Sequence, residues 1–236
     1  MNFTEKAKQK KINIAIDGWS ACGKGTLAKD LSQALGYLCI DTGAMYRAVT
    51  WAAIQEQVAP QESESLHNLL QRIHITLQTD SDQNILVFVN GKNITEAIRS
   101  AEVNAQVSQY SALTAVRRFL VKQQQDIAKE GGVVMDGRDI GTVVLPHAEL
   151  KIFMTASHEI RAQRRYLEEK NKGKNPRLDD ISANIQERDH IDANREDSPL
   201  QQAKDAKVLD NSHLNTEEQR NLALRWAIEA IENKVS

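Results

Sequence analysis

Short apolar runs alternate with longer segments of helical periodicity along most of the chain. The run at 12–17 is followed by a glycine-containing turn and by three leucines at helical spacing, and we expect this helix to end at Gly36. A second apolar run at 37–41 leads into a helix predicted over 44–57. Strands that alternate with helices in this way are typical of a parallel sheet covered by helices.

This alternation is interrupted in the first half of the chain. The strand-like runs at 74–78 and 85–91 have only the polar turn TDSDQN between them, which predicts an antiparallel hairpin. We therefore expect a small inserted subdomain over roughly residues 66–99.

The alternating pattern returns after the hairpin. Helical periodicity over 101–129 ends at two glycines. Then follow strands at 133–137, 149–156 and 206–212, a charged segment at 157–195 with two helices around the loop NKGKNPR, and a helix from 216 to about 234. This last helix opens with TEEQ, in which Thr216 can act as the N-cap and Gln219 can bond back to it.

Composition fits a folded α/β protein. The chain has 236 residues, 41% of them hydrophobic and 26% charged, with a formal net charge of -2. This balance gives no sign of a nucleic-acid partner. The two cysteines match no metal or disulfide pattern, and the polar, lysine-rich N-terminus has no apolar stretch for a signal peptide or a membrane span. We expect a cytoplasmic protein that contacts no membrane.

The stretch GWSACGKGT at 18–26 matches the GxxxxGK pattern of a phosphate-binding loop. Gly18 and Gly23 allow backbone N–H groups to approach a phosphate, and Lys24 can reach the outer phosphates. The helix that begins within the loop adds its positive end. A strand before the loop and a helix after it are the context that this pattern requires.

One position of the loop departs from the usual pattern. Gly25 follows the lysine, and the hydroxyl group comes one place later, at Thr26. We therefore expect Mg²⁺ to be held mainly by phosphates and water. Asp136, at the end of its strand, is either a partner of that ion through water or a carboxylate that caps the loop.

Arginines and polar side chains follow two more of the predicted strands. Asp41, Thr42 and Arg47 come after one strand, and Arg138 and Asp139 after another, so both sets lie at the carboxyl edge of the sheet where α/β proteins bind ligands. Further arginines recur at helical spacing at 161, 164, 165, 188 and 195. These are either solvated helix faces or, beside a phosphate-binding loop, a set of phosphate ligands.

A triphosphate site by itself also suits a switch, a motor or a transporter subunit. The many arginines favour a phosphate acceptor, because a monophosphate attacks with an oxygen that is already anionic and needs no catalytic base. Repulsion between the two phosphate groups is then the main obstacle, and converging arginines counteract it. Kinases of UMP, shikimate or dephospho-coenzyme A, and a nucleotide-binding switch, remain alternatives.

Five motifs stand in the order found in one family: IDGWSACGKGTLAK, DTGAMYRA, DGRDIGTVV, KIFMTAS and ERDHIDANR. On these motifs the chain resembles the bacterial cytidylate kinases, which are P-loop nucleoside monophosphate kinases, over nearly its whole length. The resemblance implies transfer of the γ-phosphate of ATP to CMP or dCMP with Mg²⁺, and we expect a monomer. It also implies a P-loop three-layer α/β fold with a parallel five-stranded sheet, an inserted monophosphate-binding subdomain with a small antiparallel sheet, and a short arginine-rich lid.

The resemblance also divides the chain. It predicts an N-terminal tail at 1–10 and one kinase domain at 11–236. Within that domain the core is formed by 11–65, 105–156 and 196–236, the insertion by about 66–104 and the lid by about 157–195.

The same resemblance assigns site residues. The ATP loop comprises Gly18, Trp19, Ser20, Ala21, Cys22, Gly23, Lys24, Gly25 and Thr26, with Trp19 where many members have proline and Cys22 as a small filler. Thr42 and Arg47 are expected at the acceptor phosphate, Ser108, Arg117 and Asp139 at the cytosine, Arg188 and Asp192 at the ribose, and Arg138, Arg165 and Arg195 in the phosphate clamp. The expected catalytic residues are Lys24, Arg47, Arg138 and Arg165.

Overall fold

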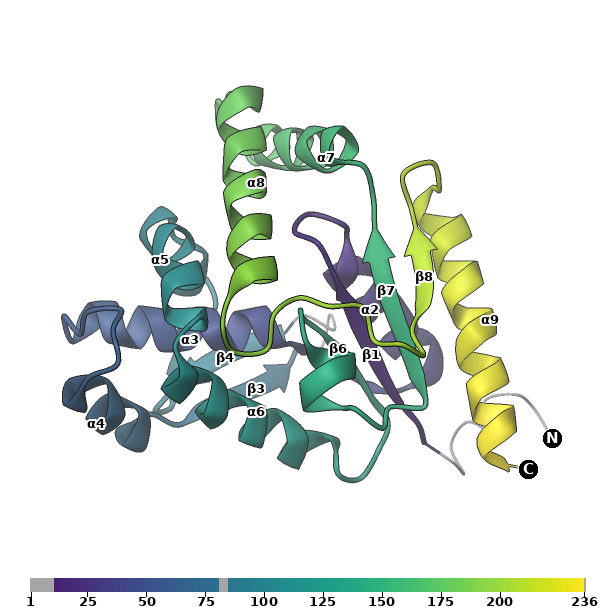
Figure 1. Cartoon of the computed structure of the whole chain (residues 1–236), viewed down its shortest axis with the longest axis horizontal. Helices are drawn as coiled ribbons and strands as arrows, with labels where there is room; N and C mark the ends of the chain where they lie inside the picture. The colour runs from purple at the N-terminus through teal and green to yellow at the C-terminus, as the bar shows by residue number, and fades with distance from the viewer. Residues whose placement is uncertain (1–10, 81–84, 236) are drawn as a thin grey trace. The chain divides into compact units, whose positions relative to one another are not determined.

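The computed structural model describes residues 11–80 and 85–235. The expected tail at 1–10 and most of the polar turn at 79–84 therefore lie outside the described residues. The larger sheet has the strand order β2-β6-β1-β7-β8 and the smaller one β3-β4-β5. Figure 1 labels β6, β1, β7 and β8 of the larger sheet and β3 and β4 of the smaller one. The predicted α/β fold with a five-stranded sheet and a small antiparallel sheet is confirmed.

The larger sheet places β1 at its centre, with β6 and β7 as parallel neighbours. Its strands are β1 (Asn13–Gly18), β2 (Leu38–Asp41), β6 (Val133–Asp136), β7 (Leu150–Thr155) and β8 (Lys207–Asp210). Because parallel neighbours end at the same edge, the segments that follow β1, β6 and β7 are brought close together. These segments carry the glycine loop, the DGRD motif and the start of the arginine-rich region.

Two compact units make up the chain. Unit 2 spans Ile40–Lys129, and unit 1 is formed by the chain on both sides of it. The helical elements of unit 1 are α2 (Lys24–Leu35), the π-helical turn η2 (Ile140–Val144), α7 (His158–Asn171), α8 (Leu178–Asn194) and α9 (Thr216–Val235). In unit 1, α2 packs on β6 and α9 packs on β7, and a buried cluster of aliphatic side chains fills the space between these helices and the sheet.

Unit 2 contains the smaller sheet and its surrounding helices. Its elements are α3 (Thr42–Gln55), α4 (Glu64–Arg72), β3 (Ile75–Thr79), β4 (Ile85–Val89), β5 (Lys92–Asn93), η1 (Ala97–Arg99), α5 (Ala101–Ser111) and α6 (Thr114–Ala128). The predicted hairpin is confirmed as β3 and β4, which pair antiparallel. The helix α4 and the short strands and turns β5, η1 and η2 were not predicted.

Two predicted helix starts were wrong. The helix expected over 44–57 begins at Thr42, because the Asp41 carboxylate accepts the N–H of Ala44 at 2.8 Å and caps it there. Thr216 is not the cap of α9. Asn215 and Glu218 form the reciprocal capping box instead, each side chain accepting the other's backbone N–H at 2.9 Å.

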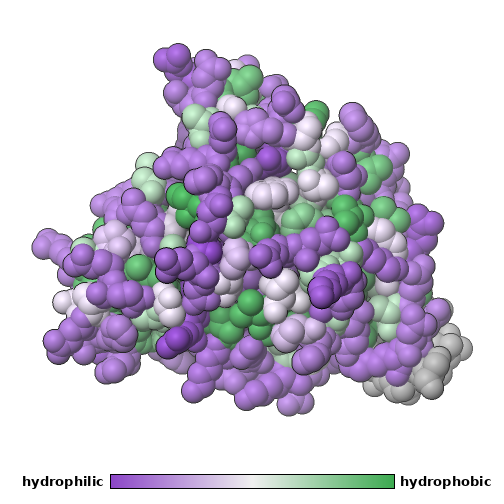
Figure 2. Space-filling model, in the orientation of Figure 1, coloured by the Kyte–Doolittle hydropathy of each residue, from purple (hydrophilic) through white to green (hydrophobic). Residues whose placement is uncertain are grey.

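The surface is mostly polar. The face in Figure 2 is coloured largely hydrophilic, with hydrophobic residues scattered among hydrophilic ones. Among residues 11–80 and 85–235, the large hydrophobic side chains that are exposed are those of Leu38, Ile127, Leu167, Leu178 and Val208. Over the described part of the chain, no helix combines the length and the apolar character that crossing a membrane requires.

Candidate active site

The glycine loop joins the end of β1 to the start of α2. Gly18 has φ +147°, and a Cβ there would lie 2.1 Å from the carbonyl oxygen of Met154, so only glycine fits. Gly23 caps α2 in the left-handed conformation, with φ 86° and no side-chain cap. Gly23, Gly25 and Thr26 are exposed. The first N–H groups of α2 therefore face accessible space, as anion binding requires.

Lys24 lies inside this loop. Its side chain is buried, and Nζ donates to the carbonyl oxygens of Gly18 at 2.8 Å and Trp19 at 2.7 Å. Burial, with the neighbouring charge of Arg138 adding to it, lowers the Lys24 pKa to about 7. A polyphosphate would favour the charged form, so binding and protonation of Lys24 are linked.

Asp17, which directly precedes the loop, was not recognised as important from the sequence. Its Oδ1 accepts the N–H of Ile140 and its Oδ2 that of Gly141, both at 2.7 Å. These bonds tie the end of β1 to the turn that follows Asp139. Burial raises the Asp17 pKa to about 6, although the two N–H donors act in the opposite direction.

A network of charges lies beside the loop. Arg138 Nε donates to Asp192 Oδ2 at 2.6 Å, and Arg195 Nη2 donates to Asp139 Oδ1 at 3.3 Å. The side chains of Arg195 and Asp139 are 4% and 5% exposed. Despite burial, Asp192 raises the Arg138 pKa above its usual value, while Arg138 holds the Asp192 pKa below its usual range. Arg188 lowers the Asp192 pKa further. The structure thus groups five predicted site residues in unit 1.

Asp136 ends β6 next to the loop. It pairs in register with Ile16, and its Oδ2 lies 3.9 Å from the position that a Cβ on Gly25 would occupy. Within the described ranges, no group of three or more His, Cys, Asp or Glu side chains could hold a metal ion by itself. Asp136 and the exposed Thr26 hydroxyl are oxygen donors that suit Mg²⁺ only if phosphates complete its coordination.

The arginines of α7 take different positions. Arg161 donates to the carbonyl oxygen of Ser20 at 3.1 Å, and Arg164 donates to Asn211, whose Nδ2 in turn donates to the carbonyl oxygen of Cys22 at 2.9 Å. Arg165, expected in the phosphate clamp, pairs with Glu168 and Glu169 of its own helix. Arg161 and Arg164 therefore support the loop backbone.

The other predicted residues belong to unit 2. Arg47 Nη2 forms an ion pair with Asp41 Oδ2 at 2.9 Å, and Thr42 is buried at the start of α3. Arg117 is buried, lies 5.6 Å from the centre of the Tyr46 ring and donates to the carbonyl oxygen of Ser111 at 3.1 Å. Ser108 is partly buried on α5, one turn before this carbonyl group.

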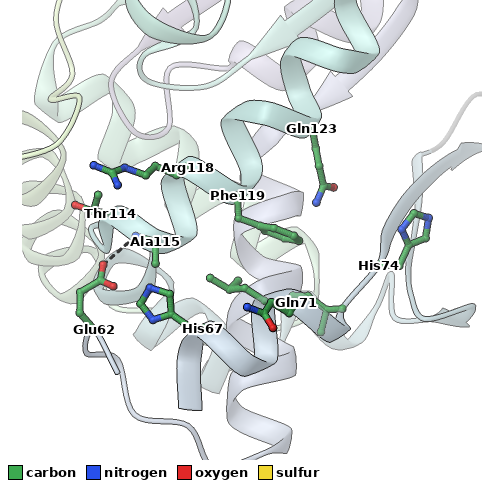
Figure 3. Close-up of a pocket in the computed structure, with 11 residues that line it drawn as sticks. Glu62, His67, Gln71, His74, Thr114, Ala115, Arg118, Phe119 and Gln123 are labelled. Carbon is green, nitrogen blue, oxygen red and sulfur yellow. Dashed lines mark hydrogen bonds between the residues drawn. The ribbon is translucent and has the colours of Figure 1, made fainter. Parts of the chain in front are cut away.

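Unit 2 also contains a cavity of about 770 Å³ (Figure 3). It is lined by Glu62, His67, Leu70, Gln71, Ile73, His74, Thr114, Ala115, Arg118, Phe119 and Gln123. Two of these lining residues are joined by a hydrogen bond, in which the Glu62 carboxylate accepts the N–H of Ala115 at 2.9 Å. None of the lining residues is a predicted nucleotide contact, and Arg117, which precedes Arg118, is buried elsewhere.

Comparison with known proteins identifies similar chains. Residues 14–227 match the family model described as cytidylate kinase. A cytidylate kinase of Phocaeicola vulgatus is 50% identical over 96% of this chain and 99% of its own length. Cytidylate kinases of Bacteroides fragilis and Flavobacterium psychrophilum are 52% and 50% identical over 89% and 91% of this chain and 94% and 97% of their own lengths.

Proposed function

Because the chain belongs to the cytidylate kinase family, we propose that it transfers the γ-phosphate of ATP to CMP or dCMP, giving ADP and CDP or dCDP. The observation that carries this proposal is the exposed N-terminus of α2, with Lys24 beneath it and Arg138 beside it. Such an arrangement supplies backbone donors and fixed positive charge to a phosphoryl group in transfer.

The residues of the loop would bind the donor. The N–H groups of Gly23, Lys24 and Gly25 would donate hydrogen bonds to the β-phosphate, and Lys24 would exchange its carbonyl partners for phosphate oxygens. Arg138 and Arg195 neutralise charge on the phosphates, and Arg165 joins them when it leaves its glutamate partners. The buried carboxylates that pair with Arg138 and Arg195 hold both guanidinium groups in fixed orientations.

The acceptor contacts follow the family pattern. Arg47 and Thr42 would hold the monophosphate, while Ser108, Arg117 and Asp139 would recognise the cytosine edge. Arg188 and Asp192 would contact the ribose. A CMP phosphate oxygen is already a competent nucleophile, so no general base is assigned.

The oxygen ligands beside the loop, the Asp136 carboxylate and the Thr26 hydroxyl, suit an Mg²⁺ ion that binds together with ATP. Asp136, through water, and Thr26 would help to hold it, and it would neutralise charge on the β- and γ-phosphates. We further propose that the protein acts as a monomer in the cytoplasm, without a nucleic-acid or membrane partner.

A coupled assay with a panel of acceptors tests the function. We expect ADP to form from ATP with CMP or dCMP, and much more slowly with UMP, AMP, shikimate or dephospho-coenzyme A. Lys24→Met, at the same protein concentration, is the matched control and should abolish the signal. A marked preference for a non-cytidine acceptor would refute the proposed specificity, and nucleotide binding without acceptor-dependent turnover would favour a switch.

A further inference from the structure

The peptide groups on both sides of Ser20, within the phosphate-binding loop, are held by side chains from two helices. Asp189 Oδ1, on α8, accepts the N–H of Ser20 at 3.2 Å. Arg161 Nη1, on α7, donates to the carbonyl oxygen of Ser20 at 3.1 Å and to Asp189 Oδ2 at 2.5 Å. These bonds form a closed set, which we name the Arg161–Asp189 clamp. It joins α7, α8 and the loop.

The clamp is anchored to the sheet and shielded from solvent. Arg161 Nε donates to the carbonyl oxygen of Ala156, directly after β7, at 3.1 Å. The side chains of Arg161 and Asp189 are only 8% and 14% exposed. Charge-assisted hydrogen bonds are stronger in such surroundings than at a surface, so the clamp holds a defined geometry.

The next residue shows why the loop needs this support. Ala21 has φ 58°, a left-handed conformation that residues other than glycine rarely adopt. Ala21 lies between Ser20, which the clamp holds, and Cys22, whose carbonyl oxygen accepts a hydrogen bond from Asn211. Fixing both neighbours keeps Ala21 in this conformation, and thereby sets the direction of the N–H groups that follow.

We propose that Arg161 and Asp189 are positioning residues that hold the loop in its phosphate-binding shape and so set the affinity for the donor nucleotide. The inference deepens the proposed function and rests on it. Arg161 Nη1 and Nε are already directed to two carbonyl oxygens and a carboxylate, so the side chain acts on the nucleotide through Ser20 and Ala21. The acceptor is not affected directly.

Asp189→Asn and Arg161→Lys test the clamp. Titration calorimetry of ATP without acceptor should show Kd raised about tenfold in Asp189→Asn, equivalent to about 1.4 kcal/mol. Arg161→Lys should show a smaller rise in Kd, because an ammonium group keeps the positive charge but cannot make all the hydrogen bonds of the planar guanidinium group. In steady state the KM for ATP should rise in the same proportion, while the KM for CMP should change less than about twofold. Amide exchange at Ser20 should accelerate in Asp189→Asn.

Two control variants separate positioning from general stability. Asp180→Asn removes an exposed carboxylate from the same helix, and its Kd for ATP should equal that of the wild type. Ile231→Val removes a buried methylene group from α9, and should lower the melting temperature without changing the Kd for ATP.

Three results would overturn the clamp: an ATP affinity in both clamp variants equal to that of Asp180→Asn, a loss that Ile231→Val reproduces, or an equal rise in the two KM values. If the wild type binds ATP and the clamp variants lose affinity, but no protein phosphorylates CMP, the clamp stands and the proposed function fails. If the wild type phosphorylates CMP and the clamp variants bind ATP with wild-type affinity, the proposed function stands and the Arg161–Asp189 clamp fails.

Discussion

Replacing Asp17 by asparagine tests how the phosphate-binding loop is joined to the turn after β6. Asp17 is 4% exposed, and its carboxyl group accepts two N–H groups, from Ile140 and Gly141. Asparagine keeps the shape but offers one acceptor in place of two, and it stays neutral at every pH. The charged groups that act on Asp17 are Asp139, which raises its pKa, and Lys24, which lowers it, and Lys151 packs against Gly141 nearby.

The magnitude follows from the Asp17 pKa of about 6 against an ordinary value of 3.8. The folded protein binds more protons than the unfolded chain between these values, so the free energy of unfolding falls as pH rises through this window. In total, the free energy of unfolding falls by about 3 kcal/mol as Asp17 loses its proton, and about 2 kcal/mol of this fall occurs between pH 4.5 and pH 7.

Urea unfolding followed by circular dichroism, at pH steps from 4.5 to 7, measures this. Because other titrating groups are common to both proteins, the difference between wild type and Asp17→Asn isolates this carboxyl group. We expect the wild type to lose about 2 kcal/mol of stability relative to the variant across the series. A free-energy difference between wild type and Asp17→Asn that stays constant over the pH series would contradict a raised Asp17 pKa.

Three further predictions concern the loop and its neighbours. Calorimetry of ATP binding at pH 8, in buffers of different ionisation enthalpy, should reveal uptake of roughly 0.9 proton because the Lys24 pKa is about 7, and no uptake in Lys24→Met. Arg138→Ala should lower kcat about 100-fold or more in the coupled assay. The free energy of unfolding in urea should fall by at most about 2 kcal/mol, because Arg195 still faces Asp192, the carboxylate partner of Arg138. A fall in kcat that corresponds to no more free energy than the fall in stability would contradict a catalytic role. Gly18→Ala should destabilise the fold by about 2 kcal/mol more than Gly173→Ala. Both glycines have positive φ, but only a Cβ at position 18 would collide with the Met154 carbonyl oxygen. Equal melting temperatures of the two variants would contradict this.

The sequence was sufficient for the parts of the fold that depend on local pattern. The glycine loop and the order of strands and helices around it follow from residues close together in the chain, because periodicity and glycine placement are local signals. The break of the predicted helical stretch at 101–129 into α5 and α6, at Ala112 and Leu113, has no comparable signal.

The start of α9 shows why tertiary contacts decide what a local pattern leaves open. The segment NTEEQ holds two overlapping capping boxes, one from Asn215 and one from Thr216. Gln219, which the second box would use, is buried and accepts a hydrogen bond from Asn211 instead. The first box therefore forms.

The clamp depends on contacts that no local pattern contains. Ser20 and Asp189 are 169 positions apart, and Ser20 and Arg161 are 141 apart. The spacing of arginines in α7 predicted a shared helix face but not that Arg161 turns to the loop backbone while Arg165 pairs within its helix. For Asp17, its place directly before the first loop glycine was a usable signal.

The most direct test of the proposed phosphoryl transfer is a ³¹P NMR time course of the wild-type protein with ATP, Mg²⁺ and CMP. We predict that the γ-phosphate signal of ATP declines while the two signals of CDP grow in equal amount, without inorganic phosphate. Growth of inorganic phosphate without CDP, or unchanged spectra with folded protein that binds ATP, would show that the protein does not phosphorylate CMP.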